Sequence, residues 1–432
     1  MSLDPRALSL AFSAAVLASL LVKFWLATRQ MRHVAQHRDT VPAAFADRVS
    51  PQAHRKSADY ALARQRHAIV AAAWSSALVV GWTLLGGLAW LDAGVHAALG
   101  THGGPMVTQL VLVGAFLLAG ALLDLPFELH EHFVLEARFG FNKLTPAQFL
   151  KDAALSFGLA LLIGTPLLAL LLWIMQATGA RWWLWAWGAL TAFQLLAMVV
   201  FPIWIAPLFN KFEPLADEAL VARVQALMQR CGLRARGFFV MDGSRRSAHS
   251  NAYFTGLGRG KRVVFYDTLL ARLSGTEVEA VLAHELGHFR LHHLPKRLLP
   301  MLGVSLAGFA LLGWLKSQPG FYLGLGVMPS LAAPNDALAL LLFMLALPPF
   351  LYFVSPLFAG VSRRHEYEAD AYARTQADAA DLARALLKLH EDNAATLTPD
   401  PLFVRFYYSH PPLTMRLAAL GQDGAPSAGA AA

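Results

Sequence analysis

Cysteine is nearly absent from this 432-residue sequence, in which Cys231 stands alone. A single thiol excludes an intramolecular disulfide and leaves the redox compartment open. Charged residues are also scarce, at 15% against 56% hydrophobic residues, and this balance excludes an ordinary soluble enzyme. The sequence also lacks a soluble face with interleaved basic and aromatic residues, so its net charge of +8 does not indicate a nucleic-acid partner.

Long hydrophobic runs account for this composition. Any one run could be a buried core helix, but seven in one chain predict a mostly α-helical, multi-pass membrane protein. Prolines such as Pro166, Pro202 and Pro348 predict kinks or broken ends in three of the runs. Each run is close to the roughly 20 residues that cross a bilayer, and they lie at 7–26, 68–92, 106–125, 153–176, 183–207, 299–315 and 336–358.

Lysine and arginine are missing from the linkers 95–105 and 317–335, whereas the segment 27–67 is rich in them. By the positive-inside rule this basic segment is cytoplasmic and the N-terminus lies outside. No A-x-A cleavage site follows the first run, so we expect that run to remain as a membrane anchor. Alternation of the spans places three later segments on the cytoplasmic side: 126–150, 208–298 and the C-terminal tail.

The stretch VLAHELGHFRLHH contains His284, Glu285 and His288 in the pattern HExxH. Residues four apart share one face of a helix, so both imidazoles can reach one tetrahedral metal ion. The glutamate beside the first histidine is placed to act as a base toward water. This combination is typical of zinc proteases.

A third metal ligand has to come from the same side of the membrane as the two histidines. Glu366 and Asp370, in SRRHEYEADAYA after the seventh run, stand four residues apart on a helix expected to reach about His390. We predict that Glu366 holds the zinc and that Asp370 orients a ligand histidine from behind. A solvated, charged helix face is the alternative interpretation of this pair.

Other candidate ligands fit less well. The longer pattern HExxHxxGxxH is not continued, because Leu291 and Leu294 occupy its later glycine and histidine positions. His292, one more turn along the helix face, and Glu368 remain the alternative third ligands, although we favour a polar helix end as the interpretation of His292. A further cluster comprises Glu128, His130, Glu131 and His132. We expect it to cap and solvate a helix end, and a gating role or a second metal site is the alternative.

The polar insert at 208–298 is predicted to be a cytoplasmic α/β unit. An amphipathic helix at about 216–231 precedes three short apolar stretches, GFFVMD, NAYFTG and RVVFYD. Thr276 and Glu279 form a T-x-x-E capping box, which predicts that the HExxH helix starts near residue 277. NAYF as an edge strand would offer main-chain groups to an extended peptide, and an ordinary sheet strand is the alternative.

These observations divide the chain into five parts. They are 1–207 with spans one to five, 208–298 with the zinc-protease insert, 299–358 with spans six and seven, 359–420 with a helical part that completes the site, and a flexible tail at 421–432.

The chain resembles the type I CAAX prenyl endopeptidases, which are membrane zinc proteases with seven spans. The resemblance covers almost the whole chain, and FGFNKLT at 139–145 and IAPLFNKFEPL at 205–215 match as well. Four further motifs carry it, in the same order: SRRSAHSNAYFTG at 244–256, HELGH at 284–288, SRRHEYEADAYA at 362–373 and SHPPLTMR at 409–416.

The resemblance implies one Zn²⁺ per chain, held by His284, His288 and Glu366, with Glu285 as general base. It also implies that a large water-filled chamber between the spans opens onto this site. His410 is expected to stabilise the oxyanion. The substrate side of the site is expected to comprise Asn251, Ala252, Tyr253 and Arg416.

The function that follows is hydrolysis of peptide bonds near the C-terminus of CAAX-type proteins, prenylated in the family. A membrane quality-control metalloprotease with unprenylated substrates is the alternative, and a metal-binding transporter or inactive scaffold is a more distant one. Glu285 argues against a transporter, which needs no base beside a ligand histidine.

The excess of arginine over lysine and the many alanines hint at a high-GC bacterium, hence an inner membrane with the active site facing the cytoplasm. The partners are then a peptide or protein and the bilayer, and the oligomeric state stays open.

Overall fold

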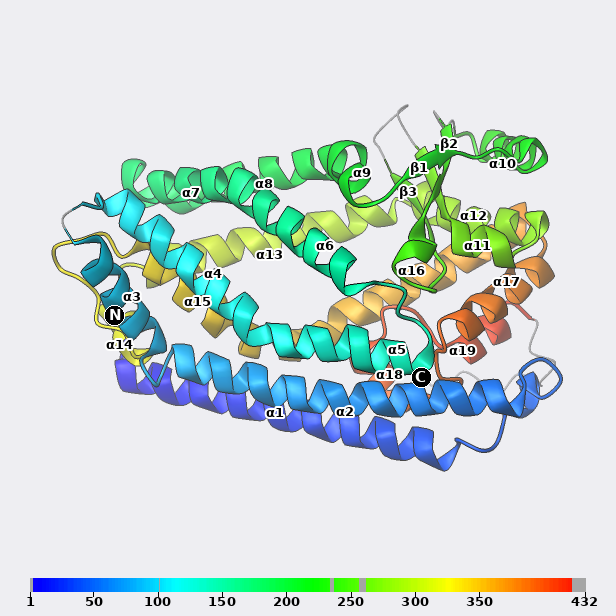
Figure 1. Ribbon diagram of the computed structural model, residues 1–432, viewed down its shortest axis with the longest axis horizontal. Coiled ribbons are helices and arrows are strands. Elements are labelled where there is room, and N and C mark those ends of the chain that lie inside the picture. The colour runs from blue at the N-terminus through cyan, green and yellow to red at the C-terminus, as the bar shows by residue number, and fades with distance from the viewer. Residues whose placement is uncertain (1–2, 101, 234–236, 256–261, 422–432) are drawn as a thin grey trace.

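Helices dominate the computed structural model, which describes residues 3–100, 102–233, 237–255 and 262–421 (Figure 1). The predicted tail at 421–432 lies, but for its first residue, outside this described part. Nineteen α-helices and four strands occur in the described ranges, and Figure 1 shows the sheet at one end of an elongated bundle.

The membrane part contains six continuous helical segments that are long and apolar enough to span a bilayer, and one bent pair. All seven predicted runs fall inside them, so the prediction of about seven spans is confirmed. The segments comprise α1 (Pro5–Gln36), α4 with α5 (Pro105–His130, Ala137–Phe139), α6 with α7 (Pro146–Leu159, Thr165–Ala177), α8 with α9 (Trp182–Val200, Ala206–Phe209), α13 (His293–Leu315) and α15 with α16 (Asp336–Leu351, Ser355–Gln376).

The bent pair consists of α2 (Pro51–Trp82) and α3 (Gly87–Leu99), which meet at an angle of 55°. Gly86 lies at the bend with φ of 79°, a conformation that residues with a side chain rarely adopt. A side chain at Gly87 would collide with the carbonyl oxygen of Gly81, 2.7 Å from the Cβ position. Glycines at this point therefore let the helix turn sharply within one span.

Prolines coincide with breaks in two of the other spans, as the sequence predicts. Pro202 lies within a π-helical turn, Phe201–Ile205, and Pro166 lies two residues after another, Ala160–Gly164. Proline lacks an amide hydrogen and its ring crowds the preceding turn, so the regular helical hydrogen bonds cannot continue there. Pro348 instead lies inside α15, and the helix gives way only later to a 3₁₀ turn, Tyr352–Val354. The helices nevertheless remain long enough to cross the bilayer.

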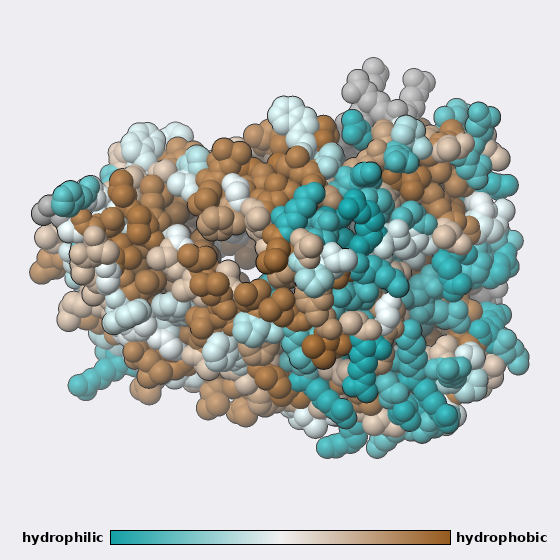
Figure 2. Space-filling model, in the orientation of Figure 1, coloured by the Kyte–Doolittle hydropathy of each residue, from teal (hydrophilic) through white to brown (hydrophobic). Residues whose placement is uncertain are grey.

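The surface also separates into a membrane part and a water-exposed end. Figure 2 shows hydrophobic residues over the helices of the membrane part and hydrophilic residues over the end that carries the sheet. On the hydrophobic face an opening leads toward the interior of the bundle (Figure 2). This distribution is that of an integral multi-pass membrane protein with a water-exposed domain at one end.

The sheet has the order β1-β2-β4-β3, with β2 and β4 parallel and the outer pairs antiparallel. The strands are β1 (Phe212–Pro214), β2 (Gly237–Met241), β3 (Ala252–Thr255) and β4 (Arg262–Tyr266). Each of the three predicted apolar stretches forms a strand, and β3, which contains most of NAYF, is an edge strand. An α/β insert is therefore confirmed.

Short helices complete the water-exposed end and pack around the HExxH helix, α12 (Gly275–Arg290). In the core of this domain Leu282 and Leu286 of α12 are fully buried together with Val263 and Phe265 of the sheet. The surrounding helices are α10 (Glu218–Arg230), α11 (Asp267–Arg272), α17 (Ala379–Asp392) and α19 (Leu413–Ala419), while α14 (Pro319–Gly324) and α18 (Pro401–Tyr407) pack against α1.

The start of α12 differs from the prediction. The capping box is formed by Ser274 and Glu277, since the amide of Ser274 donates to Glu277 Oε2 at 2.7 Å and the Glu277 amide donates to Ser274 Oγ. The predicted pair of Thr276 and Glu279 is wrong, because the helix already begins at Gly275. Glu279 instead binds two arginines of α10, Arg223 and Arg230.

Candidate active site

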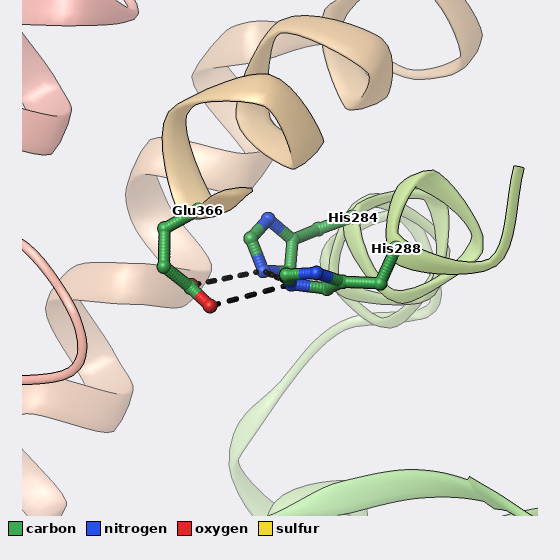
Figure 3. Close-up of side chains that lie close together, drawn as sticks. All are labelled: His284, His288 and Glu366. Carbon is green, nitrogen blue, oxygen red and sulfur yellow. Dashed lines mark hydrogen bonds and ion pairs between the residues drawn. The ribbon is translucent and has the colours of Figure 1, made fainter. Parts of the chain in front are cut away.

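Three side chains from two helices converge at the centre of the water-exposed domain (Figure 3). His284 and His288 project from α12, and Glu366 projects from α16 toward both rings. The Nε2 atom of each histidine lies 3.4 Å from one oxygen of the Glu366 carboxylate, and the two Nε2 atoms are 3.2 Å apart. The sequence prediction that these three residues come together agrees with this geometry.

Close packing of the two helices makes this convergence possible. At Gly287, in the middle of HELGH, a Cβ atom would lie only 3.0 Å from the Cα atom of Ala369. Such a distance is below ordinary van der Waals contact, so this crossing admits no larger residue at position 287. Because Gly287 and Ala369 are both small, α16 can approach α12 closely enough for Glu366 to reach the two histidines.

His284 is held from behind by a carboxylate. Its Nδ1 atom lies 2.8 Å from Asp370 Oδ1, and both carboxylate oxygens of Asp370 accept hydrogen bonds from Arg416 at 2.6 and 2.8 Å. Because Asp370 accepts the Nδ1 proton, the Nε2 lone pair faces Glu366. Burial opposes protonation of His284, whereas the neighbouring carboxylates of Asp370 and Glu366 favour it and raise its pKa to about 8, so a metal ion bound at Nε2 takes the place of a proton there.

His288 is held by a second chain of groups that the sequence analysis missed. Its Nδ1 atom lies 2.9 Å from Nδ1 of the buried His293, whose Nε2 lies 3.0 Å from Glu368 Oε2. Glu368 can only accept, so His293 donates through Nε2 and must accept at Nδ1 the proton of His288. The Nε2 lone pair of His288 therefore also faces Glu366.

These proton positions test whether the site suits a metal ion. Two imidazole lone pairs and a carboxylate face one point, and Glu366 Oε2 is a buried oxygen without a hydrogen-bond partner in the described part of the chain. Three negatively polarised atoms so close together repel one another unless a cation lies between them. Two imidazoles and one carboxylate form a donor set that zinc accepts with one position left open.

A second histidine group near the site fits a metal less well. His293 and His365 stack with their ring centroids 4.1 Å apart and their planes only 8° from parallel, and Glu368 lies beside them. Imidazole lone pairs lie in the ring plane, so parallel stacked rings cannot both approach one ion to the usual distance of about 2.0–2.1 Å. This group is better explained as support for His288.

The alternative third ligands do not meet the site. His292 is exposed and adopts φ of 57°, where the chain turns between α12 and α13, so its ring leaves the helix face of His284 and His288. Glu368 uses one carboxylate oxygen for His293 and the other for Arg364. Both residues were open alternatives from the sequence, and their contacts favour Glu366.

Glu285 lies in the wall of a small cavity of about 110 Å³, the catalytic cavity, which His284 and Glu366 also line. Burial raises the pKa of its carboxyl group above the ordinary value. A carboxylate with a raised pKa is a stronger base, which suits a group that takes a proton from water. The cavity is also lined by Asn251, Ala252, His410 and Arg416.

The residues expected to face a substrate lie around this cavity. His410 has its Nε2 atom 3.4 Å from Glu366 Oε1 and keeps 64% of its side-chain surface exposed, so it is free to meet a ligand. Asn251 directly precedes β3, and Tyr253 pairs with Val264 inside the strand. Arg416 is buried and its guanidinium is engaged by Asp370, so its contacts favour support of His284 over direct substrate binding.

Arg363 is a further residue that the sequence analysis did not single out. Its Nη1 atom lies within hydrogen-bond distance of the carbonyl oxygens of Val404, Arg405 and Tyr408, at 2.7–3.3 Å. These carbonyls belong to the end of α18 and the segment after it, which leads to His410. Arg363 thus holds in place the segment that carries His410 to the cavity.

The histidine cluster at 128–132 lies elsewhere. His130 stacks on His67 of α2, with ring centroids 5.1 Å apart, and Glu131 begins a π-helical turn, Glu131–Glu136. Among the described residues the cluster does not gather three ligand atoms at one point. The expected helix end is wrong, because the helical segment Pro105–Phe139 continues through these residues, and contacts with His67 of α2 account for His130 and Glu131.

We expect Glu368→Gln to weaken zinc binding by about 10- to 100-fold, because the charge that fixes His293, and through it His288, is lost. Competition with a chromophoric chelator measures this affinity independently of turnover. Arg364→Met is the control, since Arg364 touches the outer oxygen of Glu368 and is largely exposed. Equal zinc affinity in Glu368→Gln and the native protein would show that this chain of groups does not support the ligand.

Comparison with sequence families gives two matches that together cover most of the chain. Residues 30–211 match the family described as CAAX prenyl protease N-terminal, five membrane helices. Residues 214–423 match Peptidase family M48. The boundary between the two matches falls where the last span before the sheet ends.

Curated relatives are similar over most of their length. The chain is 38% identical over 326 residues to CAAX prenyl protease 1 of Saccharomyces cerevisiae, covering 72% of both chains. It is 31% identical over 453 residues to the CAAX prenyl protease 1 homolog of Homo sapiens, covering 95% of both. The crystal structure of S. mikatae Ste24p matches with a TM-score of 0.88 and 32% identity, over 96% of this chain and 98% of that one.

Proposed function

This chain belongs to peptidase family M48 and is a membrane zinc endopeptidase, and we propose that it cleaves CAAX-type proteins or peptides near their C-termini. The observation that carries the proposal is the convergence of two imidazole lone pairs and a carboxylate beside the half-buried Glu285. The names of the similar proteins support the choice of substrate class.

We assign the metal site to His284, His288 and Glu366, with one zinc ion per chain. When bound there, zinc polarises the scissile carbonyl and makes water more acidic. Asp370 and His293 hold the two ligand histidines in the tautomers that present Nε2. The protein thereby keeps three ligands fixed and one position open toward the cavity.

The chain's own residues then account for the proton transfers. Glu285 takes a proton from the attacking water and passes it to the leaving amine, for which its raised pKa is suited. His410, which is accessible and lines the same cavity as Glu285, donates a hydrogen bond to the oxygen that gains negative charge. The free edge of β3 and Asn251 hold the substrate main chain in an extended form.

The test of substrate class is cleavage of one peptide that ends in a CAAX sequence, prepared with and without a farnesyl group. We expect the purified enzyme to release the C-terminal residues, with the farnesylated form preferred, as mass spectrometry of the products would show. Equal cleavage of both forms would support a quality-control protease instead. Absence of cleavage by zinc-loaded protein would contradict the proposed activity and favour a scaffold or transporter.

We expect His410→Ala to lower kcat by about 10²- to 10³-fold while zinc content stays unchanged. A hydrogen bond aimed at a developing oxyanion acts mainly in the transition state, so its loss changes kcat more than KM. Steady-state kinetics on the CAAX peptide measure both constants. Ser409→Ala is the matched control, because Ser409 contacts only the other ring nitrogen. An increase in KM with kcat unchanged would make His410 a binding residue instead.

We propose that the segment 27–67, the water-exposed domain with the sheet and the C-terminal part face the cytoplasm. We also propose that the membrane is a bacterial inner membrane. Arg29 at the end of α1 binds Asp400 at 2.9 Å, so the basic segment lies beside the C-terminal part. A cysteine introduced at the exposed Lys56, beside the buried Ser57, in a Cys231→Ser background should resist labelling by membrane-impermeant maleimide in intact cells. Labelling from outside would reverse the assigned orientation.

A further inference from the structure

A cavity of about 710 Å³ lies between α1, α2 and the segment from the end of α17 through α18 (Figure 1). It is separate in sequence from the HExxH and SRRHE motifs. Aromatic residues, including Tyr60 and Tyr408, line it together with two cationic side chains, Lys23 and Arg64. The mechanism above uses none of these four residues.

This cavity continues toward the active site. A third cavity, of about 370 Å³, lies between the large cavity and the catalytic cavity beside Glu285. It shares Asn393 and Tyr408 with the large cavity, and it shares His410 and Arg416 with the catalytic cavity. Tyr408 therefore stands where the large cavity and the third cavity meet. Arg64 and Tyr408 both line the large cavity.

The two cations in the large cavity have no acidic partner. Within the described residues, Arg64 packs over the ring of Tyr60 and Lys23 over the ring of Tyr352, at 5.6 and 5.1 Å, and neither forms an ion pair with a carboxylate. Glu136 contacts two other residues of the cavity, Tyr60 and His249, and neither of the two cations. Unpaired positive charge in a partly enclosed space favours an anionic ligand.

The spacing along the chain suits the end of a short peptide. His249 lines the large cavity and Asn251 lines the catalytic cavity, and two residues span at most about 7 Å. A peptide whose scissile bond lies beside Glu285 and which continues for three residues extends about 10 Å. Its terminal carboxylate then reaches the large cavity.

We infer that this cavity binds the C-terminal carboxylate of the substrate, with Arg64 and Lys23 as the residues that recognise it. The inference rests on the proposed function and adds a determinant of specificity to it. Recognition of a free carboxylate three residues beyond the scissile bond would restrict cleavage to true chain ends. It would also fix the register of the peptide relative to Glu285.

The experiment compares one CAAX peptide as a free acid and as a C-terminal amide. We expect the native enzyme to cleave the amide with a kcat/KM about 10- to 100-fold lower, as for loss of a hydrogen bond to a charged group. Arg64→Met should reduce cleavage of the free acid by a similar factor and leave cleavage of the amide nearly unchanged. The ratio between the two peptides should then approach one, and Lys23→Met should lower it in the same direction.

Arg66→Met is the matched control, because Arg66 has the same charge on the same helix but lines a different cavity, beside α4. It should keep the full preference for the free acid. An unchanged preference in Arg64→Met, or equal cleavage of acid and amide by the native enzyme, would overturn the inference. An Arg64→Met effect that instead follows the farnesyl group would assign the cavity to the lipid and also overturn it.

Binding provides a readout that does not depend on turnover. Fluorescent forms of the acid and amide peptides can be titrated onto zinc-loaded Glu285→Gln protein with and without Arg64→Met. Tighter binding of the acid that disappears with Arg64→Met supports the inference, and equal binding of the two forms contradicts it. Failure of the native enzyme to cleave either peptide would count against the proposed function, while this titration still decides the role of the cavity.

Discussion

Glu285→Gln should abolish most peptide cleavage, with turnover lower by about 10²- to 10⁴-fold, while the zinc stays bound. Glutamine has nearly the shape of glutamate but cannot accept a proton from water at neutral pH. Glu285 is half-buried in the catalytic cavity, and among the described residues the metal-facing group consists of His284, His288 and Glu366 only. The substitution therefore removes the base without removing a ligand.

Two measurements on the same purified sample decide this prediction. Metal analysis should give one zinc per chain in both proteins, and cleavage of the CAAX peptide should persist only in the native one. Glu279→Gln is a suitable control, because Glu279 lies on the same helix and binds arginines of α10 away from the cavity. Turnover near the native value in Glu285→Gln, at equal zinc occupancy, would rule out the proposed base.

Local sequence was sufficient to predict the first half of the site. The spacing of His284 and His288 places both rings on one helix face whatever the surrounding fold, and the hydrophobic runs place all spans because bilayer thickness fixes their length. Glu366 required one more step, since it is 78 residues after His288. Topology supplied that step, because only segments on the same side of the membrane can share a metal ion.

The support for His288 could not be predicted in the same way. His293 contacts His288 only because the chain adopts a left-handed conformation at His292, which breaks the helix between the two rings. Helical periodicity only placed His292 one turn further along the face, and the interpretation favoured from the sequence, a polar helix end, agrees with its exposed position after α12. A residue other than glycine in this conformation gives no clear sequence signal, since its stability depends on the tertiary contacts around it.

The misplaced cap of α12 has a related cause. Ser274, Thr276, Glu277 and Glu279 offer two overlapping patterns of the same type, shifted by two residues. Local chemistry allows either pair, and the arginines of α10 decide between them by binding Glu279. A capping pattern thus predicts that a helix begins nearby, while packing against another helix selects the residue.

Glu366→Gln should lose zinc almost completely, and cleavage with it. Among the described residues this carboxylate is the one anionic group that faces the Nε2 atoms of both His284 and His288, at 3.4 Å from each, and two neutral imidazoles alone hold zinc weakly. The loss of affinity should exceed the 10- to 100-fold expected for Glu368→Gln, which changes only a supporting contact. The comparison of the two variants therefore separates a ligand from its support.

Chelator competition on both variants, side by side, gives the result. Glutamine preserves the volume of the buried side chain, so a change in zinc affinity would not arise from a cavity in the packing between α12 and α16. Thermal unfolding in the presence of excess chelator should be similar for Glu366→Gln and the native protein, which checks that the fold is intact. Native zinc affinity in Glu366→Gln would mean that the third ligand lies elsewhere, and the pair of helices would then be held together by packing at Gly287 and Ala369 without a shared metal ion.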